Sequence, residues 1–393
     1  MVKVLTLLFV LLVLSECSTP STSAPTNVTP IVATHVQRDL ATPAPISAPT
    51  ATPLTAPAIA PAQPSTIPPE RPTALPPLLP SPTASGAAII PSFSYPIGMP
   101  GKPLGDGFFI RDGAQVENTW YNPGYWHTGE DWYTMRGDTA GARVYAVTDG
   151  EVVYAGANYP GRVVIVRHAP DLYSMYGHLD PSLKVQVGQQ IKRGDILGTV
   201  LRRGDKTPNH LHFEIRTFLT AREVNGDTPR YSFRCGVNCP PGPGYWPMNA
   251  PDLPSDLGWR IPTHVMAQRM FPSDAGGQLG EVVVATQPIS SSVSLWSASP
   301  DQGTREAVGE LELHPGERFR LLGLHAGPED SHASSALGYE LWYRIGLPDG
   351  RMGWVQVAVP STFDTGADGR PSSVYFNFFP AIDAMPYSKE QND

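Results

Sequence analysis

The order of apolar and polar residues along the chain predicts a first β-rich region between about residues 95 and 220. Short apolar or alternating runs recur there at intervals of about ten to fifteen residues, with glycines between them. The runs are ARVYAVTDGEVVYAG, GRVVIVRH, LYSMYGHL, GDILGTVL and HLHFEIR. Alternation with a period of two predicts strands, and no run sustains the 3.6-residue period of a helix. We therefore expect a mainly antiparallel β-sheet domain.

A second β-rich region follows between about residues 281 and 359. Its runs are EVVVATQ, VSLWSA, ERFRLLGL and ELWYRIGLPDGRMGWVQVAV. In the last run LPDG lies between two alternating segments, which is typical of a hairpin turn. We expect this region to form a small β-barrel.

The first seventeen residues, MVKVLTLLFVLLVLSEC, have the pattern of an export signal. Lys3 precedes an apolar run from Val4 to Leu14, which is too short to span a hydrocarbon core of roughly 30 Å as a helix. The segment LSEC resembles a bacterial lipobox, in which Cys17 would be acylated, although Glu16 stands where that pattern prefers a small residue. The alternative is simple secretion, with cleavage in the following Ser/Ala-rich stretch.

Composition separates residues 18–90 from the rest of the 393-residue chain. This segment holds 17 of the 44 prolines, no aromatic residue and four charged residues. It lacks the large apolar side chains whose burial offsets the entropy of ordering, so we expect a disordered, semi-extended linker. The formal net charge is −8, and no basic block occurs, which argues against nucleic acid as a partner.

The chain therefore divides into six expected parts. These are a signal with lipobox (1–17), a Pro/Ala/Ser/Thr-rich linker (18–90), a first β domain (91–225), a connector (226–280), a second β domain (281–360) and a tail (361–393). The connector contains Cys235 and Cys239 in RCGVNCPPGPGYW. An oxidising compartment would pair these two as a local disulfide, and the alternative is two free thiols.

Five residues of the first β domain could carry chemistry. His127 and Asp131 lie in HTGED, His178 closes LYSMYGHL, and His210 and His212 flank a leucine in HLHFEIR. Residues two apart on a strand share a face, so His210 and His212 should project together. Two His and one Asp would meet the three-ligand requirement of a catalytic Zn²⁺ site, and two His would remain for proton transfer. A single HxH pair is more often structural, so spacing and order carry this interpretation.

The order HxxxD, GHL and HLHFE resembles that of the LytM/lysostaphin-type zinc endopeptidases of bacterial cell walls. The resemblance covers about residues 95–220 and includes VTDGEVVYAG and VQVGQQIKRGDILGTV. It implies that the first β domain (91–225) is a zinc metallopeptidase domain. It further implies that His127, Asp131 and His212 bind zinc, and that His178 and His210 are the catalytic histidines.

The chain departs from the family pattern immediately before the HLH motif. The family usually has a Gly/Ser/Thr-rich turn there, whereas this chain has GDKTPNHLH, with Pro208 and Asn209 in the turn. This change puts substrate preference in doubt more than activity.

The second β domain, with LWYRI, the PDG turn and GWVQV, resembles bacterial SH3-type domains. Such domains often accompany cell-wall hydrolases and can bind wall peptides. The motif mainly describes a barrel core, so Trp354 is expected to pack inside. Wall binding and a purely structural role both stay open.

Together these features predict a zinc metalloendopeptidase that cleaves stem peptides or cross-bridges of peptidoglycan. We expect it outside the cytoplasm in the cell envelope, secreted or anchored to the membrane through a lipid on Cys17, and monomeric. One alternative is a catalytically inactive, wall-binding regulator of other wall hydrolases, which loss of site residues would indicate. Another is a wall-binding scaffold dominated by the SH3-like domain.

Overall fold

The computed structural model describes eight ranges of the chain, and all of them lie after the expected linker. They are residues 93–119, 121–156, 161–219, 244–271, 279–330, 339–361, 364–366 and 369–381. Every described residue belongs to one compact unit of the chain. The expected signal, Cys17, the whole linker, Cys235 and Cys239 lie outside the described residues.

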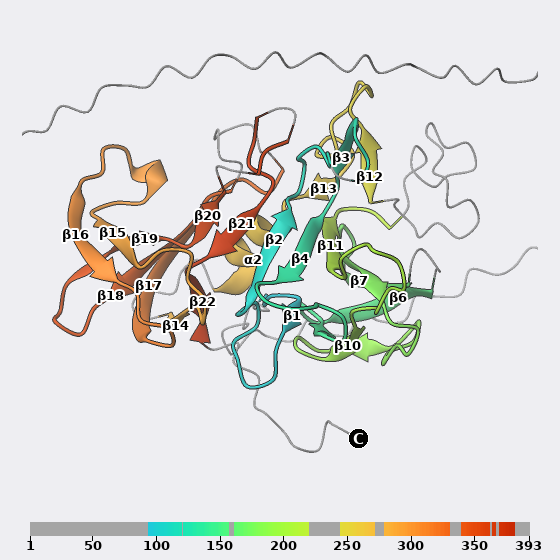
Figure 1. Ribbon diagram of the computed structural model, residues 1–393, viewed down its shortest axis with the longest axis horizontal. Coiled ribbons are helices and arrows are strands. Elements are labelled where there is room, and N and C mark those ends of the chain that lie inside the picture. The colour runs from blue at the N-terminus through green and yellow to red at the C-terminus, as the bar shows by residue number, and fades with distance from the viewer. Residues whose placement is uncertain are drawn as a thin grey trace, which may run out of the picture. The chain divides into compact units, whose positions relative to one another are not determined.

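The described part is mainly β, with antiparallel sheets, which confirms the predicted fold class (Figure 1). Its α-helix is α2 (Pro262–Met270), and a short 3₁₀ turn, η2, spans Pro300–Gln302. Among these residues, no helix has the length and apolar character needed to cross a membrane.

The largest sheet has ten strands and contains both HTGED and HLHFEIR. The order along it is β20 (Ala358–Pro360), β21 (Val374–Phe376), β2 (Phe108–Asp112), β4 (Glu130–Thr134), β11 (Leu211–Arg216), β8 (Leu172–Leu179), β7 (Arg162–Ala169), β6 (Gly150–Gly156) and β9 (Gln190–Ile191), with β13 (Trp259–Arg260) paired to β11. Strand β4 runs beside β11, which brings the two motifs together.

Two smaller sheets lie in the same half of the chain. The first joins β1 (Ile97–Gly98), β5 (Arg143–Tyr145) and β10 (Ile196–Thr199). The second pairs β3 (Tyr125–His127) with β12 (Tyr245–Pro247). Strand β12 comes from the expected connector, so that segment contributes directly to the surroundings of His127.

The region after residue 279 forms a seven-stranded sheet. Its order is β16 (Ala307–Glu312), β15 (Ser292–Trp296), β19 (Met352–Gln356), β18 (Leu341–Gly346), β17 (Arg318–Ala326), β14 (Gly280–Val284) and β22 (Phe378–Pro380). Trp354 of β19 is 9% exposed. The hairpin expected around LPDG is present, because β18 pairs with β19 across it.

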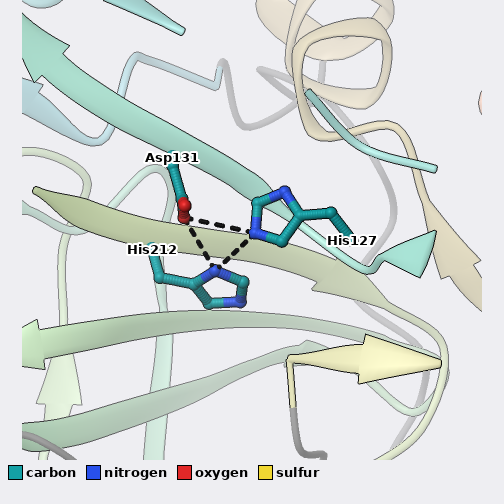
Figure 2. A group of neighbouring side chains, drawn as sticks. All are labelled: His127, Asp131 and His212. Atoms are coloured by element: carbon teal, nitrogen blue, oxygen red, sulfur yellow. Dashed lines mark hydrogen bonds and ion pairs between the residues drawn. The ribbon is translucent and has the colours of Figure 1, made fainter. Parts of the chain in front are cut away.

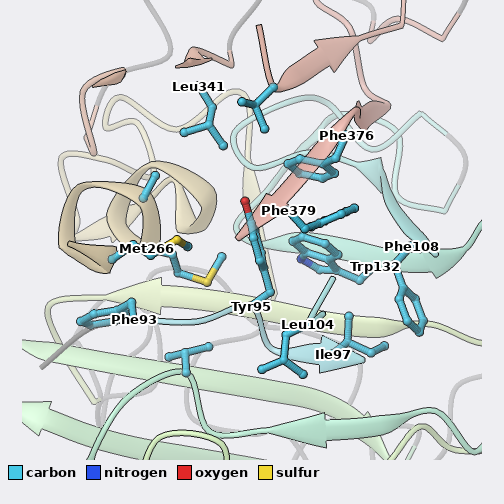
Figure 3. Close-up of a cluster of buried hydrophobic side chains, with 14 of the residues drawn as sticks. Phe93, Tyr95, Ile97, Leu104, Phe108, Trp132, Met266, Leu341, Phe376 and Phe379 are labelled. Carbon is cyan, nitrogen blue, oxygen red and sulfur yellow. The ribbon is translucent and has the colours of Figure 1, made fainter. Parts of the chain in front are cut away.

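Strands β21 and β22 lie in the segment expected to be a tail, and they join the two large sheets. Ile110 of β2 is paired with Val374 of β21, whereas β22 pairs with β14. Phe376 stacks on Trp132 of β4, with ring centroids 5.5 Å apart, inside one continuous core (Figure 3). Strand β21 therefore extends the sheet that carries the candidate site, and β22 extends the seven-stranded sheet.

Candidate metal centre

Three elements bring the proposed ligands together. His127 is the last residue of β3, and a short turn through Gly129 leads to Asp131 in β4. In the pairing of β4 with β11, Asp131 lies directly opposite His212. His127 and Asp131 thus meet across a turn, rather than along one extended strand.

The ligand atoms of these three residues form a compact cluster, as Figure 2 shows. His127 Nε2 lies 3.2 Å from Asp131 Oδ1, and His212 Nδ1 lies 3.0 Å from the same oxygen. The two ring nitrogens are 3.0 Å apart. All three side chains are buried. Within the described ranges, this is the group of three His, Cys, Asp or Glu residues whose ligand atoms lie within 4.8 Å of one another.

Hydrogen bonds on the far side of each ring determine which nitrogen faces the cluster. His127 Nδ1 lies 3.2 Å from the carbonyl oxygen of Gly113, and His212 Nε2 lies 3.0 Å from Glu214 Oε1. These oxygens only accept, so both ring nitrogens donate, and a neutral ring has a lone pair on its other nitrogen. Two lone pairs and a carboxylate oxygen then face one another in a buried space.

That arrangement requires a positive charge at its centre, because three buried acceptors would otherwise repel one another. Two imidazoles and one carboxylate form a donor set that suits Zn²⁺. Asp131 Oδ2 is buried and has no hydrogen-bond partner, with His210 Nε2 3.5 Å away, so this oxygen could share in binding a cation. The residues therefore fit a metal ion.

The electrostatics of the metal-free cluster agree with this conclusion. Burial opposes ionisation of Asp131, but His127 and His210 hold the pKa of its carboxyl well below the usual range. Burial also opposes protonation of His212, but hydrogen bonds to Asp131 and Glu214 outweigh it and raise its pKa to about 9. A proton therefore occupies the place that a cation would take, and metal binding would release it.

The other two histidines of the motif series lie beside the cluster. The ring of His178 is 4.7 Å from that of His210 and 6.1 Å from that of His212, measured between centroids. His210 Nδ1 donates to the carbonyl oxygen of Pro208 at 3.0 Å, so its Nε2 can accept a proton. Burial lowers the pKa of His210, which favours the neutral form that a general base needs.

The structure adds Glu214, which the sequence interpretation did not assign. Its carboxylate accepts from Thr128 Oγ1 at 2.8 Å and from Trp259 Nε1 at 3.1 Å, besides contacting His212. Arg216 Nη1 lies 3.3 Å from Glu214 Oε2, and both side chains are fully buried. The sequence pattern could have indicated Glu214. Residues 210, 212, 214 and 216 are each two positions apart, so they lie on the same face of the strand.

Residues 126–226 match the family model of Peptidase family M23. This M23 segment contains all five residues of the candidate site, and the match covers the part of the chain that builds the metal cluster.

Curated relatives and a solved structure also match part of the chain. Peptidoglycan DD-endopeptidase ShyB of Vibrio cholerae is 36% identical over 90 residues, which is 23% of this chain and 20% of that protein. Murein hydrolase activator NlpD of Salmonella dublin is 33% identical over 116 residues, 29% of each protein. The catalytic domain of the antimicrobial peptidase lysostaphin from Staphylococcus simulans is 28% identical, with a TM-score of 0.23, covering 27% of this chain and 77% of that one. The chain spans less than a third of the length of the curated relatives that it matches.

Proposed function

We propose that this protein is a zinc-dependent metalloendopeptidase that hydrolyses peptide bonds of bacterial peptidoglycan. The observation that carries the proposal is the buried cluster of His127, Asp131 and His212, whose three acceptor atoms face one another with two further histidines alongside. The M23 match over residues 126–226 supports the same reaction class.

The geometry of the chain's own residues supports the following proposed roles. His127, Asp131 and His212 would hold zinc, which supplies a water of lowered pKa and polarises a carbonyl. His210 Nε2 is positioned to accept the proton of the attacking water as general base. His178, beside His210, would stabilise the developing oxyanion or protonate the leaving amine.

Peptidoglycan is the substrate class that the relatives support. ShyB is named a peptidoglycan DD-endopeptidase, and NlpD is named a murein hydrolase activator. The chain's own turn before His210 contains Pro208 and Asn209, and Asn209 is held by a hydrogen bond from its Nδ2 to Asp138 Oδ1 at 2.8 Å. This fixed turn borders the histidines, so we propose that it contributes to substrate preference.

The name of NlpD also favours a second candidate, a catalytically inactive regulator of other wall hydrolases. Such a role would not require the complete set of five site residues. All five are present in this chain, and four of them, His178 excepted, are among its buried polar residues. We therefore rank the regulator second.

The deciding experiment uses the purified full chain loaded with zinc, with isolated sacculi and soluble wall peptides as substrates. Release of new amino termini by the wild type, lost in His210→Ala, supports the enzyme. No release with zinc bound would exclude it. In that case, stimulation of a separate wall hydrolase by the chain would establish the regulator.

We also propose that the protein is exported from the cytoplasm, as residues 1–17 suggest. It would be either anchored in the cell envelope through a lipid on Cys17 or simply secreted. In this proposal the chain is monomeric, and the SH3-like unit over residues 281–360 binds the wall.

Cys235 and Cys239 would form a disulfide, so the mature protein should show no titratable thiol from this pair before reduction. Two such thiols would exclude the bridge.

A further inference from the structure

The hydroxyl of Tyr339 connects the C-terminal half of the chain to the support of the metal cluster. Tyr339 immediately precedes the part of the chain that forms β18, and its side chain is 2% exposed. Its hydroxyl accepts a hydrogen bond from the backbone N–H of Ala114 at 2.8 Å. It donates to Glu130 Oε1, 3.2 Å away. The Tyr339 hydroxyl thus contacts two segments of the chain, one that supports His127 and one that contains Asp131.

The first of these segments holds His127. The Gly113 carbonyl, next to Ala114, accepts from His127 Nδ1, and this bond determines that Nε2 faces the cluster. The backbone around His127 is held by the same segment, because Gln115 N donates to His127 O at 2.7 Å and His127 N donates to Val116 O at 2.9 Å. A shift of this segment would therefore turn or release the imidazole.

The same segment is held from its other side by the C-terminal strands. Gly113 N donates to the carbonyl oxygen of Ser372 at 2.8 Å, and Ser373 Oγ donates to the carbonyl oxygen of Arg111 at 2.9 Å. A Cβ added at Gly113 would lie 3.0 Å from a ring carbon of Tyr339 and 3.3 Å from Ser372 O. Gly113 is therefore closely packed between two residues of the C-terminal region.

The second segment holds Asp131. Its neighbour Glu130 is fully buried, and its carboxylate also accepts from the backbone N–H of Thr263 at 2.9 Å and from Trp132 Nε1 at 3.2 Å. A fully buried carboxyl group is stable only when its hydrogen bonds are complete, so the Tyr339 hydroxyl contributes to fixing the start of β4.

We propose that Tyr339 is a positioning residue of the metal centre, which acts through the Gly113 carbonyl on His127 and through Glu130 on Asp131. The C-terminal β region is then a structural part of the metal site, and not only a separate wall-binding unit. The inference rests on the proposed metal site, but not on the proposed substrate.

The test compares Tyr339→Phe with Tyr176→Phe, both in the full chain. Tyr176 is also fully buried, and its hydroxyl also accepts a backbone N–H, from Val147 at 3.0 Å, so the two changes remove the same kind of bond. Zinc affinity is measured by competition with a chromophoric chelator. We expect Tyr339→Phe to bind zinc about 10- to 100-fold more weakly, as loss of outer support does in other metal sites. Tyr176→Phe should stay within about twofold of the wild type.

A second measurement needs no metal. Nitrogen-15 chemical shifts of the His127 ring in the metal-free protein report which nitrogen carries the proton. The wild type should show the Nδ1–H form, and Tyr339→Phe should show a mixture of the two forms. If Tyr339→Phe does not fold, Ser373→Ala, which removes the bond to Arg111, should change zinc affinity and ring tautomer in the same direction.

The inference is overturned if folded Tyr339→Phe keeps both the wild-type zinc affinity and the Nδ1–H form. It is also overturned if Tyr176→Phe weakens zinc binding equally, because the effect would then be one of stability alone. A wild type that binds zinc but cleaves no wall peptide would refute the proposed function and leave this inference standing. If the wild type binds no zinc, the tautomer of His127 decides the inference.

Discussion

Glu214 Oε1 lies 3.0 Å from Nε2 of His212, two residues earlier on the same strand. Because the carboxylate only accepts, it holds the proton of the ring on Nε2 and presents Nδ1 toward Asp131. The charge of Glu214 also makes that nitrogen a better donor to a metal ion. Strand β11 thus supplies both a proposed ligand and the group that orients it.

Replacing Glu214 with glutamine should weaken zinc binding by about 10- to 100-fold. The amide is a weaker acceptor for His212 and no longer pairs by charge with Arg216, 3.3 Å away. Chelator competition measures the effect, and thermal unfolding of the metal-free protein monitors the fold. Glu151→Gln is the matched control, since Glu151 pairs with Arg167 at the surface, with 33% of its side chain exposed. Equal zinc affinity in Glu214→Gln and the control would contradict this prediction.

The two histidines of HLH should separate metal binding from catalysis. His212→Ala should lose zinc, because it removes one of the three clustered donor atoms. His210→Ala should keep zinc and lose about two to four orders of magnitude in hydrolysis rate, because it removes the general base. Metal analysis and amine release from wall peptides measure the two properties. If His210→Ala loses zinc and His212→Ala retains it, the assigned roles are reversed.

Gly129 allows the turn between His127 and Asp131 to pack directly on β11. A Cβ at this position would lie 2.5 Å from Phe213 O and 3.0 Å from His212 Cε1. Gly129→Ala should therefore destabilise the fold by about 1–3 kcal/mol through overpacking and weaken zinc binding. Gly204→Ala, whose Cβ would meet nothing within 4 Å, should change stability by less than about 0.5 kcal/mol. Urea unfolding compares the two, and equal midpoints would count against this account of the turn.

The stability of the metal-free protein should depend on pH through His264 of α2. Its Nδ1 donates to Pro328 O at 2.8 Å, and its Nε2 accepts from Glu340 N at 3.0 Å, so the folded protein requires the neutral ring. Burial first, and the neighbouring His325 second, lower its pKa to about 4. The unfolded chain therefore takes up this proton first, and stability falls as pH drops from about 6.5 toward 4.

Between pH 7 and pH 5 this histidine should remove about 2 kcal/mol of unfolding free energy. The measurement is urea unfolding of the wild type and His264→Asn at both values. Glu340 and His325 lie beside the ring and are the same in both proteins, so the comparison isolates residue 264. An equal loss of stability in the two proteins would show that His264 is not the group responsible.

Cys17 should carry the lipid if the LSEC segment acts as a lipobox. Labelled fatty acid should then enter the wild type in bacterial cells and be absent from Cys17→Ser, because acylation requires the thiol. The two proteins are compared by fluorography after immunoprecipitation. If the wild type takes up no labelled fatty acid, the lipid anchor is excluded and simple secretion is the remaining alternative.

The sequence pattern was sufficient to predict the mainly antiparallel β fold, and the family resemblance pointed to His127, Asp131 and His212, which the structure brings into one cluster. Period-two alternation placed His210 and His212 on one face, and the short spacing in HTGED kept His127 near Asp131. Both patterns lie within short stretches of sequence, so they can be recognised without knowing which strands pair. The same alternation contained Glu214, although its role depends on contacts with Thr128 and Trp259 that only the fold provides.

The supports from the C-terminal region could not be predicted in this way. Strands β21 and β22 are three residues each, too short for a periodic signal, and they fall in a segment expected to be a tail. Tyr339 and Glu130 are 209 positions apart, and nothing in either neighbourhood indicates a partner. Long-range pairing is decided by the packing of whole sheets, which a local pattern does not contain.

Strand β21 beside β2 has a consequence for the order of events during synthesis. Ser373 and Arg111 are 262 positions apart in sequence, and Tyr339 and Ala114 are 225 apart, yet each pair is hydrogen-bonded. Contacts of such separation form late, because the entropy of closing the long loop must be met before they stabilise the fold. A chain still emerging from the ribosome or an export channel leaves the edge of β2 open and His127 without its full support. The support of the candidate metal site is thus completed only after residues 339 and 373 have been synthesised and have docked against the segment around Gly113.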